Sequence, residues 1–243
     1  MYQEAINRYL NKHGYERINL KAVLFDMDGV LFNSMPNHAR SWHKVMVRMG
    51  FGLSEQEAYM HEGRTGADTI NIISRRERGH DATDEEFKAS YAAKREEFNK
   101  CPEAPRMPGA WEVLNKIKAD NLTRMIVTGS GQVSLLDRLN KNFPGIFQKE
   151  LMVTAFDIKF GKPNPDPYLM ALEKGGFQPN EAIVIENAPL GVQAGVAAGI
   201  FTVAVNTGPL PDQVLWDAGA NLLFHSMTEF NEQWEMLKKS LVG

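Results

Sequence analysis

Short, nearly continuous apolar runs recur along the chain. Such runs are typical of strands that are buried on both faces, as in a parallel sheet. They lie at residues 22–25, 124–128, 151–155, 182–186, 201–205 and 221–225. Helical patterns lie at residues 2–12, 109–120, 132–141, 166–175, 189–198 and 227–240. Strands that alternate with helices predict an α/β fold with a doubly wound parallel sheet of the Rossmann-like type.

Residues 37–103 interrupt this alternation, because they contain no convincing strand. Their pattern predicts successive helices at residues 37–49, 54–61, 67–78 and 84–100. Three prolines and a glycine in residues 101–109 then indicate a return linker. We therefore predict an α/β core of residues 1–36 and 104–243, with an all-helical cap of residues 37–103 inserted after the first strand. An insertion at this point lies over the sheet edge where ligands bind and can act as a lid.

Composition describes an ordinary soluble protein with a substantial core. Of the 243 residues, 43% are apolar and 23% are charged. The net charge of −3 and the lack of a basic stripe predict no nucleic-acid partner. No run of 18 apolar residues is present, so we expect no membrane segment. The single cysteine, Cys101, excludes an internal disulfide and favours the cytoplasm. We expect a monomer or weak oligomer.

Two carboxylates, Asp26 and Asp28, follow the first apolar run and are separated by one residue. Alternate residues of an extended chain point to the same side, so these like charges repel each other unless a cation or a shared proton intervenes. Mg²⁺, which prefers oxygen ligands, is a natural counterion for such a pair. The pair alone is a weak signal, because aspartates often end strands and begin turns.

Further polar residues follow later strands of the predicted sheet. They are Thr128, Gly129 and Ser130 after the second run, Lys162 in a proline-rich loop, and Glu186 and Asn187 at the end of the fourth run. A hydroxyl with main-chain N–H groups at a helix start can cradle a phosphate, and a fixed ammonium suits a phosphate oxygen. Glycine-rich turns and surface lysines are common structural alternatives for each residue taken alone. The prediction of a phosphate site therefore depends on their occurring together after successive strands.

Four stretches, DMDGVLFNS, IVTGS, KFGKPNP and VIENAPLGVQAGVAAG, resemble the ordered motifs of the haloacid dehalogenase superfamily. The helical insert resembles the cap of its β-phosphoglucomutase-like subgroup. The resemblance implies that Asp26 is a nucleophile that forms an aspartyl phosphate and that Asp28 is the general acid and base. It also implies that Thr128 and Lys162 hold the transferring phosphoryl group.

The same resemblance implies a Mg²⁺ site. Its ligands would be the Asp26 carboxylate, the main-chain carbonyl of Asp28, and the side chains of Glu186 and Asn187. Gly129 and Ser130 would help to bind the substrate phosphate. Asp28 and the oxygen-bearing residues 186 and 187 fit phosphotransferases better than dehalogenases.

The cap departs from the mutase pattern in the stretch HEGRTGADT. Gly66 stands where the mutase has an arginine for the far phosphate of its substrate, and Arg64 lies two residues earlier. Glu62 occupies a position where a basic residue is expected, and Asn187 replaces the second acid of the fourth motif. We predict that Glu62 reaches Mg²⁺ when the cap closes and restores the charge lost at Asn187. The alternative, that Glu62 lies in solvent at a helix end, stays open.

Three further cap residues are candidates for substrate binding. His38 matches a linker histidine that helps to control the acid/base aspartate in the mutase, although it fits a helix-face histidine equally well. Lys94 faces either the cleft or solvent, with solvent slightly favoured. Thr65 follows Arg64 in the same cap stretch. Residues 32–35 and 102–106 form the two linkers, where hinge motion would gate water.

These residues together favour Mg²⁺-dependent hydrolysis of a small phosphorylated compound, either inorganic pyrophosphate or a sugar phosphate. A cap acid in the closed site takes space from a sugar and suits a compact, strongly charged substrate. Two alternatives stay open. One is β-phosphoglucomutase, which interconverts β-glucose 1-phosphate and glucose 6-phosphate. The other is a catalytically idle binding protein on the same fold.

Overall fold

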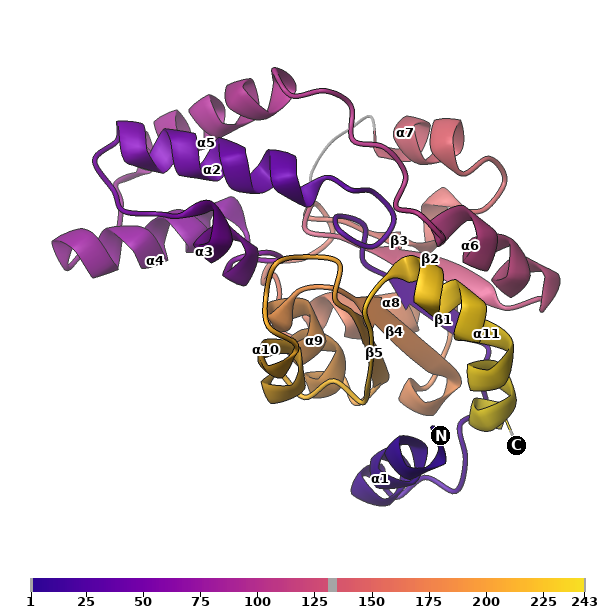
Figure 1. Cartoon of the computed structure of the whole chain (residues 1–243). Helices are drawn as coiled ribbons and strands as arrows, with labels where there is room; N and C mark the ends of the chain where they lie inside the picture. The colour runs from indigo at the N-terminus through magenta and orange to yellow at the C-terminus, as the bar shows by residue number, and fades with distance from the viewer. Residues whose placement is uncertain (1, 131–134, 243) are drawn as a thin grey trace.

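The computed structural model describes residues 2–130 and 135–242 (Figure 1). Within them, one parallel sheet has the strand order β3-β2-β1-β4-β5-β6. Its strands are β1 (Ala22–Phe25), β2 (Thr123–Val127), β3 (Met152–Val153), β4 (Ala182–Glu186), β5 (Phe201–Val205) and β6 (Leu222–Phe224). Phe25 at the end of β1 lies opposite Ile126 and Ile185 of its two neighbours. The predicted α/β class is confirmed, and the carboxyl ends of all strands meet at one edge.

Helices cover both faces of the sheet because its strands are apolar on both sides. Val23 and Phe25 pack under α6 (Ala110–Ala119), α7 (Leu135–Asn142) and α11 (Met227–Val242), whereas Ala22 and Leu24 pack under α8 (Asp166–Gly175) and α9 (Pro189–Ala197). The first part of the predicted helix 132–141 and Gly131 lie outside the described residues. No described helix has both the length and the apolar character needed to cross a membrane.

Two details differ from the sequence prediction. Strand β3 is shorter than the predicted run 151–155, because the Thr154 amide turns to donate to Asp157 Oδ2 at 2.8 Å. A short helix α10 (Asp212–Asp217) was not predicted. Six residues that follow a proline carry too little periodicity to be recognised as a helix.

The N-terminal helix α1 (Gln3–His13) packs on the amino-end side of the sheet (Figure 1). The Tyr9 ring meets Phe201 edge-on at 5.4 Å, and the Tyr9 hydroxyl donates to the Gly199 carbonyl at 2.9 Å. The helix therefore belongs to the core layer.

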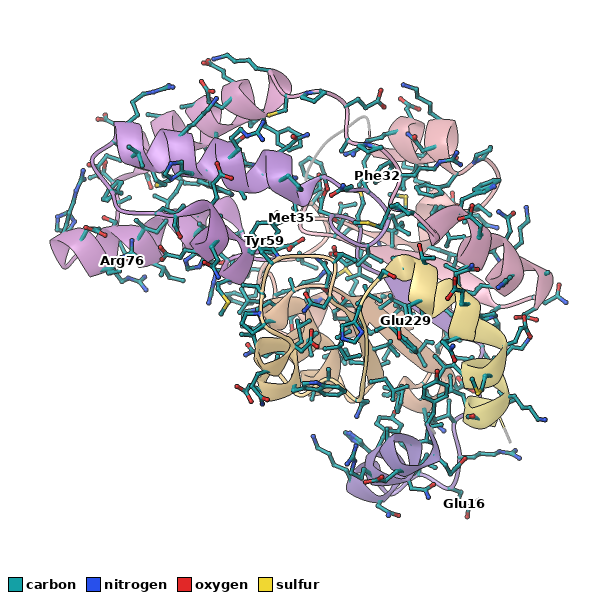
Figure 2. The ribbon with its side chains drawn as sticks, in the orientation of Figure 1. Glu16, Phe32, Met35, Tyr59, Arg76 and Glu229 are labelled. Atoms are coloured by element: carbon teal, nitrogen blue, oxygen red, sulfur yellow. The ribbon has the colours of Figure 1, made fainter. Side chains whose placement is uncertain are left out.

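The cap consists of α2 (Met35–Arg48), α3 (Glu55–Met60), α4 (Gly66–Arg78) and α5 (Asp84–Asn99). Its own apolar cluster contains Met46, Phe51, Leu53, Ile70 and Ile73. The chain leaves and re-enters the core through two adjacent segments, in which the Asn33 amide donates to the Pro105 carbonyl and the Met107 amide to the Leu31 carbonyl. Figure 2 shows Phe32 and Met35 along the first of these linkers. The four cap helices are therefore joined to the core through two linkers that lie side by side.

Candidate active site

Lys162 joins two carboxylates at the carboxyl edge of the sheet. Its Nζ donates to Asp26 Oδ1 at 2.5 Å, to Glu186 Oε1 at 2.6 Å and to the Val127 carbonyl at 3.0 Å. Asp26 is 6% exposed and Lys162 is 2% exposed. Three strand ends thus bring together the predicted nucleophile and the predicted phosphate-binding ammonium, as parallel strands that end at one edge require.

Both carboxylate oxygens of Glu186 accept hydrogen bonds in this structure, and its predicted role as a metal ligand stays a prediction. Besides Lys162, its Oε1 accepts from the Tyr168 hydroxyl at 2.7 Å. Its Oε2 accepts from the main-chain amides of Asn187 and Ala188, at 3.1 and 3.4 Å. A carboxylate has about four lone-pair sites, and four donors occupy them here. Glu186 therefore orients Lys162. Sequence reasoning missed Tyr168 because it lies in α8, whereas its partner Glu186 ends strand β4.

The charges of this cluster depend on one another. Burial raises the pKa of the Asp26 carboxyl to about 7, opposed by Lys162 and reinforced by Glu186 and Asp28. Burial alone would lower the pKa of Lys162, but the two facing carboxylates outweigh it and raise the pKa above its usual value. Lys162 therefore stays cationic and can neutralise an incoming phosphoryl oxygen.

Asp28 is held by groups at the base of the cap. Ser34 Oγ donates to Asp28 Oδ1 at 2.5 Å, and His38 Nε2 lies 3.5 Å from the same oxygen. Burial by itself would raise the pKa of the Asp28 carboxyl, but the contacts with His38 and Ser34 bring it below its usual range. The predicted general acid and base therefore rests here as a carboxylate.

Lys94 faces the cleft, which corrects the preference for solvent. It is 9% exposed, and its Nζ lies 2.9 Å from His38 Nδ1. A cationic donor at Nδ1 leaves the proton of the neutral ring on Nε2, so His38 can donate toward Asp28. Burial, with the Lys94 charge, lowers the pKa of His38, and burial lowers the pKa of Lys94 to about 8. A cap helix is thereby connected through His38 to Asp28.

The predicted phosphate loop is only partly available to a ligand. Thr128 is 3% exposed, and its Oγ1 accepts from the Ser130 amide at 3.1 Å. The Ser130 N–H is therefore not the free donor that the sequence suggested. Because Thr128 Oγ1 accepts that bond, its own hydroxyl proton remains to be donated. Gly129 and Ser130 both line the cavity between core and cap.

Glu62 reaches from the cap into the core. Its Oε2 accepts from Asn187 Nδ2 at 3.1 Å. Glu62 Oε1 and Asn187 Oδ1 are buried, and neither has a hydrogen-bond partner among the described residues. Burial, followed by the charges of Asp26, Glu186 and Asp28, raises the pKa of Glu62 well above its usual value. The alternative that Glu62 lies in solvent is therefore wrong.

The remaining cap candidates divide into two groups. Arg64 lines the cavity of about 950 Å³, and its side chain makes no hydrogen bond or ion pair within the described part of the chain. Thr65 instead caps α4: its Oγ1 accepts from the Asp68 amide at 3.1 Å and donates to Asp68 Oδ2 at 2.7 Å. Its predicted role in substrate binding is thus replaced by a structural one.

Tyr91 occupies the space beside Gly66, where the mutase pattern has its arginine. A Cβ atom added at Gly66 would lie 2.5 Å from two carbons of the Tyr91 ring. Sequence reasoning missed Tyr91, although it lies three residues before Lys94 and thus on the same helix face. The missing arginine is therefore matched by a bulky residue that fills its place.

Oxygen atoms at this edge fit a hard divalent cation. Two buried oxygens without partners, Glu62 Oε1 and Asn187 Oδ1, lie on side chains that contact each other. Among residues 2–130 and 135–242, no three His, Cys, Asp or Glu side chains form a metal cluster. The candidate oxygens are Glu62 Oε1, Asn187 Oδ1 and the main-chain carbonyl of Asp28. They do not count as such a cluster because one belongs to an amide side chain and one to the main chain. This donor set agrees with the oxygen preference of Mg²⁺.

Comparisons with known proteins agree with this geometry. Residues 23–205 match the family described as "Haloacid dehalogenase-like hydrolase". The chain is 32% identical to hexitol phosphatase A of Escherichia coli over 76% of its length and 83% of that protein. It is 28% identical to a phosphorylated carbohydrates phosphatase of Thermotoga maritima, over 83% of its length and 92% of that protein. A solved structure described as "Putative beta-phosphoglucomutase from Bacteroides vulgatus" is 77% identical, with a TM-score of 0.96 over 99% of this chain and 98% of that one. The chain belongs to the haloacid dehalogenase-like hydrolase family.

Proposed function

We propose that the protein is a Mg²⁺-dependent phosphohydrolase that acts on a small phosphorylated compound, with inorganic pyrophosphate as the first candidate. The observation that carries this proposal is the contact between Glu62 and Asn187. A cap carboxylate that enters the phosphate site repels an anionic substrate unless a cation lies between them. A cation held by the cap carboxylate can also bind a leaving group that carries negative charge. A leaving phosphate is such a group, so the cation would stabilise its departure.

The residues suggest a two-step reaction. An Asp26 carboxylate oxygen attacks phosphorus, the bond between phosphorus and the leaving oxygen breaks, and Lys162 with the Thr128 hydroxyl holds the transferring oxygens. Asp28 then takes a proton from water as that water attacks the aspartyl phosphate and releases Asp26. Mg²⁺, when bound, would neutralise charge on Asp26, Glu62 and the phosphoryl group.

The state of Asp28 also favours a phosphate leaving group. The pKa of its carboxyl is held below the usual range, so Asp28 is ionised before the reaction and has no proton to give to a leaving group. A sugar alkoxide needs a proton as it leaves, whereas a phosphate leaves as a stable anion. Arg64, which lines the same cavity without a partner among the described residues, offers that anion a positive charge.

Sugar phosphates are the second candidate class. The cavity of about 950 Å³ has room for a sugar, and two relatives bear the names of sugar or polyol phosphatases. The mutase alternative is favoured by the 77% identical structure, because that protein bears the name of a β-phosphoglucomutase. Against it, Tyr91 fills the space beside Gly66, so no arginine grips a second phosphate there. An idle binding protein fits poorly, because Asp26, Thr128 and Lys162 are all present at one edge.

Steady-state phosphate release with Mg²⁺, measured over pyrophosphate and a panel of sugar phosphates, tests the proposal. We expect pyrophosphate to have the highest kcat/KM and Glu62→Gln to need more Mg²⁺ for half-maximal activity. Asp26→Asn is the inactive control. Unchanged Mg²⁺ dependence in Glu62→Gln would remove the main support. Efficient conversion of β-glucose 1-phosphate, primed with glucose 1,6-bisphosphate, would make the protein a mutase.

A further inference from the structure

The cap segment from Tyr59 to Thr65 rests on glycines from three separate core loops. A Cβ atom added at Gly161 would lie 3.1 Å from Thr65 Cγ2, and one added at Gly208 would lie 3.2 Å from the Tyr59 ring. A Cβ atom at Gly129 would lie 3.6 Å from the Gly63 carbonyl oxygen. Figure 2 shows Tyr59 at this border between cap and core.

The backbone does not require glycine at these core positions. Gly129, Gly161 and Gly208 all lack a positive φ, so any residue could adopt their conformation. Gly63 on the cap side differs, because its φ of 87° favours glycine for conformational reasons. At Gly161 and Gly208 the nearest obstacle to a side chain is the cap itself.

One of these contacts is also connected to the catalytic loop. Thr207 Oγ1, next to Gly208, donates to the Gly29 carbonyl at 2.6 Å. A Cβ atom at Gly29 would overlap Asn187 Nδ2 at 2.0 Å, so Gly29 packs directly on the amide that donates to Glu62. Glu62 lies three residues after Tyr59. A continuous series of contacts therefore runs from Tyr59 through the core loops to Asn187 and back to the cap at Glu62.

We propose that the pairs Gly161–Thr65 and Gly208–Tyr59 form a seat that sets how closely the cap settles and thereby determines whether Glu62 reaches Asn187. The four residues are positioning residues for the proposed phosphohydrolase, and in that respect the inference rests on the proposed function. A side chain on either glycine holds the cap away by a few tenths of an ångström or more. Glu62 then loses its place beside Asn187, while the core site keeps its own contacts.

The test adds a methyl group on the core side of the seat, at Gly161, and removes one on the cap side, at Thr65. Gly161→Ala adds the obstructing Cβ, and Thr65→Ser removes Cγ2 but keeps the hydroxyl that caps α4. Amide hydrogen exchange of residues 60–66, without metal or substrate, reports whether the cap segment is seated. We expect Gly161→Ala to speed this exchange about tenfold, because the displaced segment opens more often, and to raise the Mg²⁺ requirement, because Glu62 no longer reaches Asn187. The double variant should restore both.

A second pair and a control make the test specific. Gly208→Ala should behave like Gly161→Ala and should be relieved by Tyr59→Ala. Gly52→Ala is the control, because Gly52 lies in the cap, lacks a positive φ, and its added Cβ would meet only Glu77 Oε1 at an ordinary 3.4 Å. Unchanged exchange in both obstructed variants, or failure of both double variants to restore it, overturns the seat. Restored exchange in an enzyme that does not hydrolyse pyrophosphate would support the seat and overturn the proposed substrate.

Discussion

Lys94 Nζ lies 2.9 Å from His38 Nδ1, and this contact connects the last cap helix to the base of the first. The other ring nitrogen of His38 faces Asp28 Oδ1 at 3.5 Å. Because Lys94 and His38 belong to the cap whereas Asp28 belongs to the core, opening of the cap would separate Asp28 from this support. Asp28, the proposed general base, therefore keeps its contact with His38 only while the cap covers the cleft.

The pH dependence of hydrolysis should reflect this contact. The pKa of Lys94 is lowered to about 8 by burial, so the amine loses its proton as pH rises through 8. The neutral amine no longer fixes the proton of His38 on Nε2, and kcat/KM should fall above pH 8. Lys94→Met should be about tenfold less active at pH 7 and should lack this alkaline decline. The same decline in both proteins would assign it to another group.

Lys94 should also cost stability at neutral pH. Its pKa is about 8 in the folded protein against 10.5 when unperturbed, so between these values the unfolded chain binds more protons and stability rises with pH. The cost is complete below pH 8 and disappears toward pH 10.5. We expect Lys94→Met to be more stable than wild type by about 1–3 kcal/mol at pH 7, and by less at pH 10. Urea denaturation at both pH values measures the difference, and an equal difference at both would contradict the assignment.

The positions of the core residues followed from the order of strands. Asp26 and Thr128 directly follow strands and Glu186 ends one, and parallel strands end at one edge, so their convergence needs no knowledge of packing. The N-cap role of Thr65 was not predicted, although an acid follows three residues later at Asp68. The convergence of the strand ends follows from topology, which a single sequence can reveal.

Contacts between distant elements were harder to predict. The saturation of Glu186 depends on Tyr168, which comes from α8, and the packing of Tyr91 on Gly66 joins α4 to α5. The direction of Lys94 was misjudged because a lysine on an amphipathic helix suits solvent unless a partner such as His38 lies opposite. Helical periodicity predicts on which side of a helix each residue lies, but it does not predict which residues of other elements pack against that side.

Loss of Lys162 should destabilise the fold as well as abolish hydrolysis. Without it, the buried carboxylates of Asp26 and Glu186 face each other with no cation between them, which costs about 3–5 kcal/mol. The pKa of the Asp26 carboxyl is about 7 with Lys162 present and would rise further without it, so Lys162→Met should lose stability relative to wild type as pH rises above about 7. Lys141→Met, which removes an exposed ion pair with Glu103, is the control and should leave the free energy of unfolding nearly unchanged. A loss that does not vary with pH would point to packing instead of charge.

Tyr91 should set the size of substrate that the cap admits. Its ring packs on Gly66 and lines the cavity, so Tyr91→Ala opens the cap wall opposite the phosphate site. We expect the ratio of kcat/KM for hexose phosphates to that for pyrophosphate to rise about tenfold, a change of about 1.4 kcal/mol in relative transition-state binding. Phe87→Ala is the control, because Phe87 stacks on Tyr91 at 5.8 Å but is not among the described residues that line the cavity.

Gly66→Arg alone should be poorly tolerated, since its side chain would overlap the Tyr91 ring, whereas the double variant with Tyr91→Ala gives the arginine room. Tighter binding of glucose 1,6-bisphosphate by that double variant would show that Tyr91 and Gly66 together separate this cleft from that of a mutase. Unchanged substrate ratios in Tyr91→Ala would place the selection of substrate elsewhere in the cap.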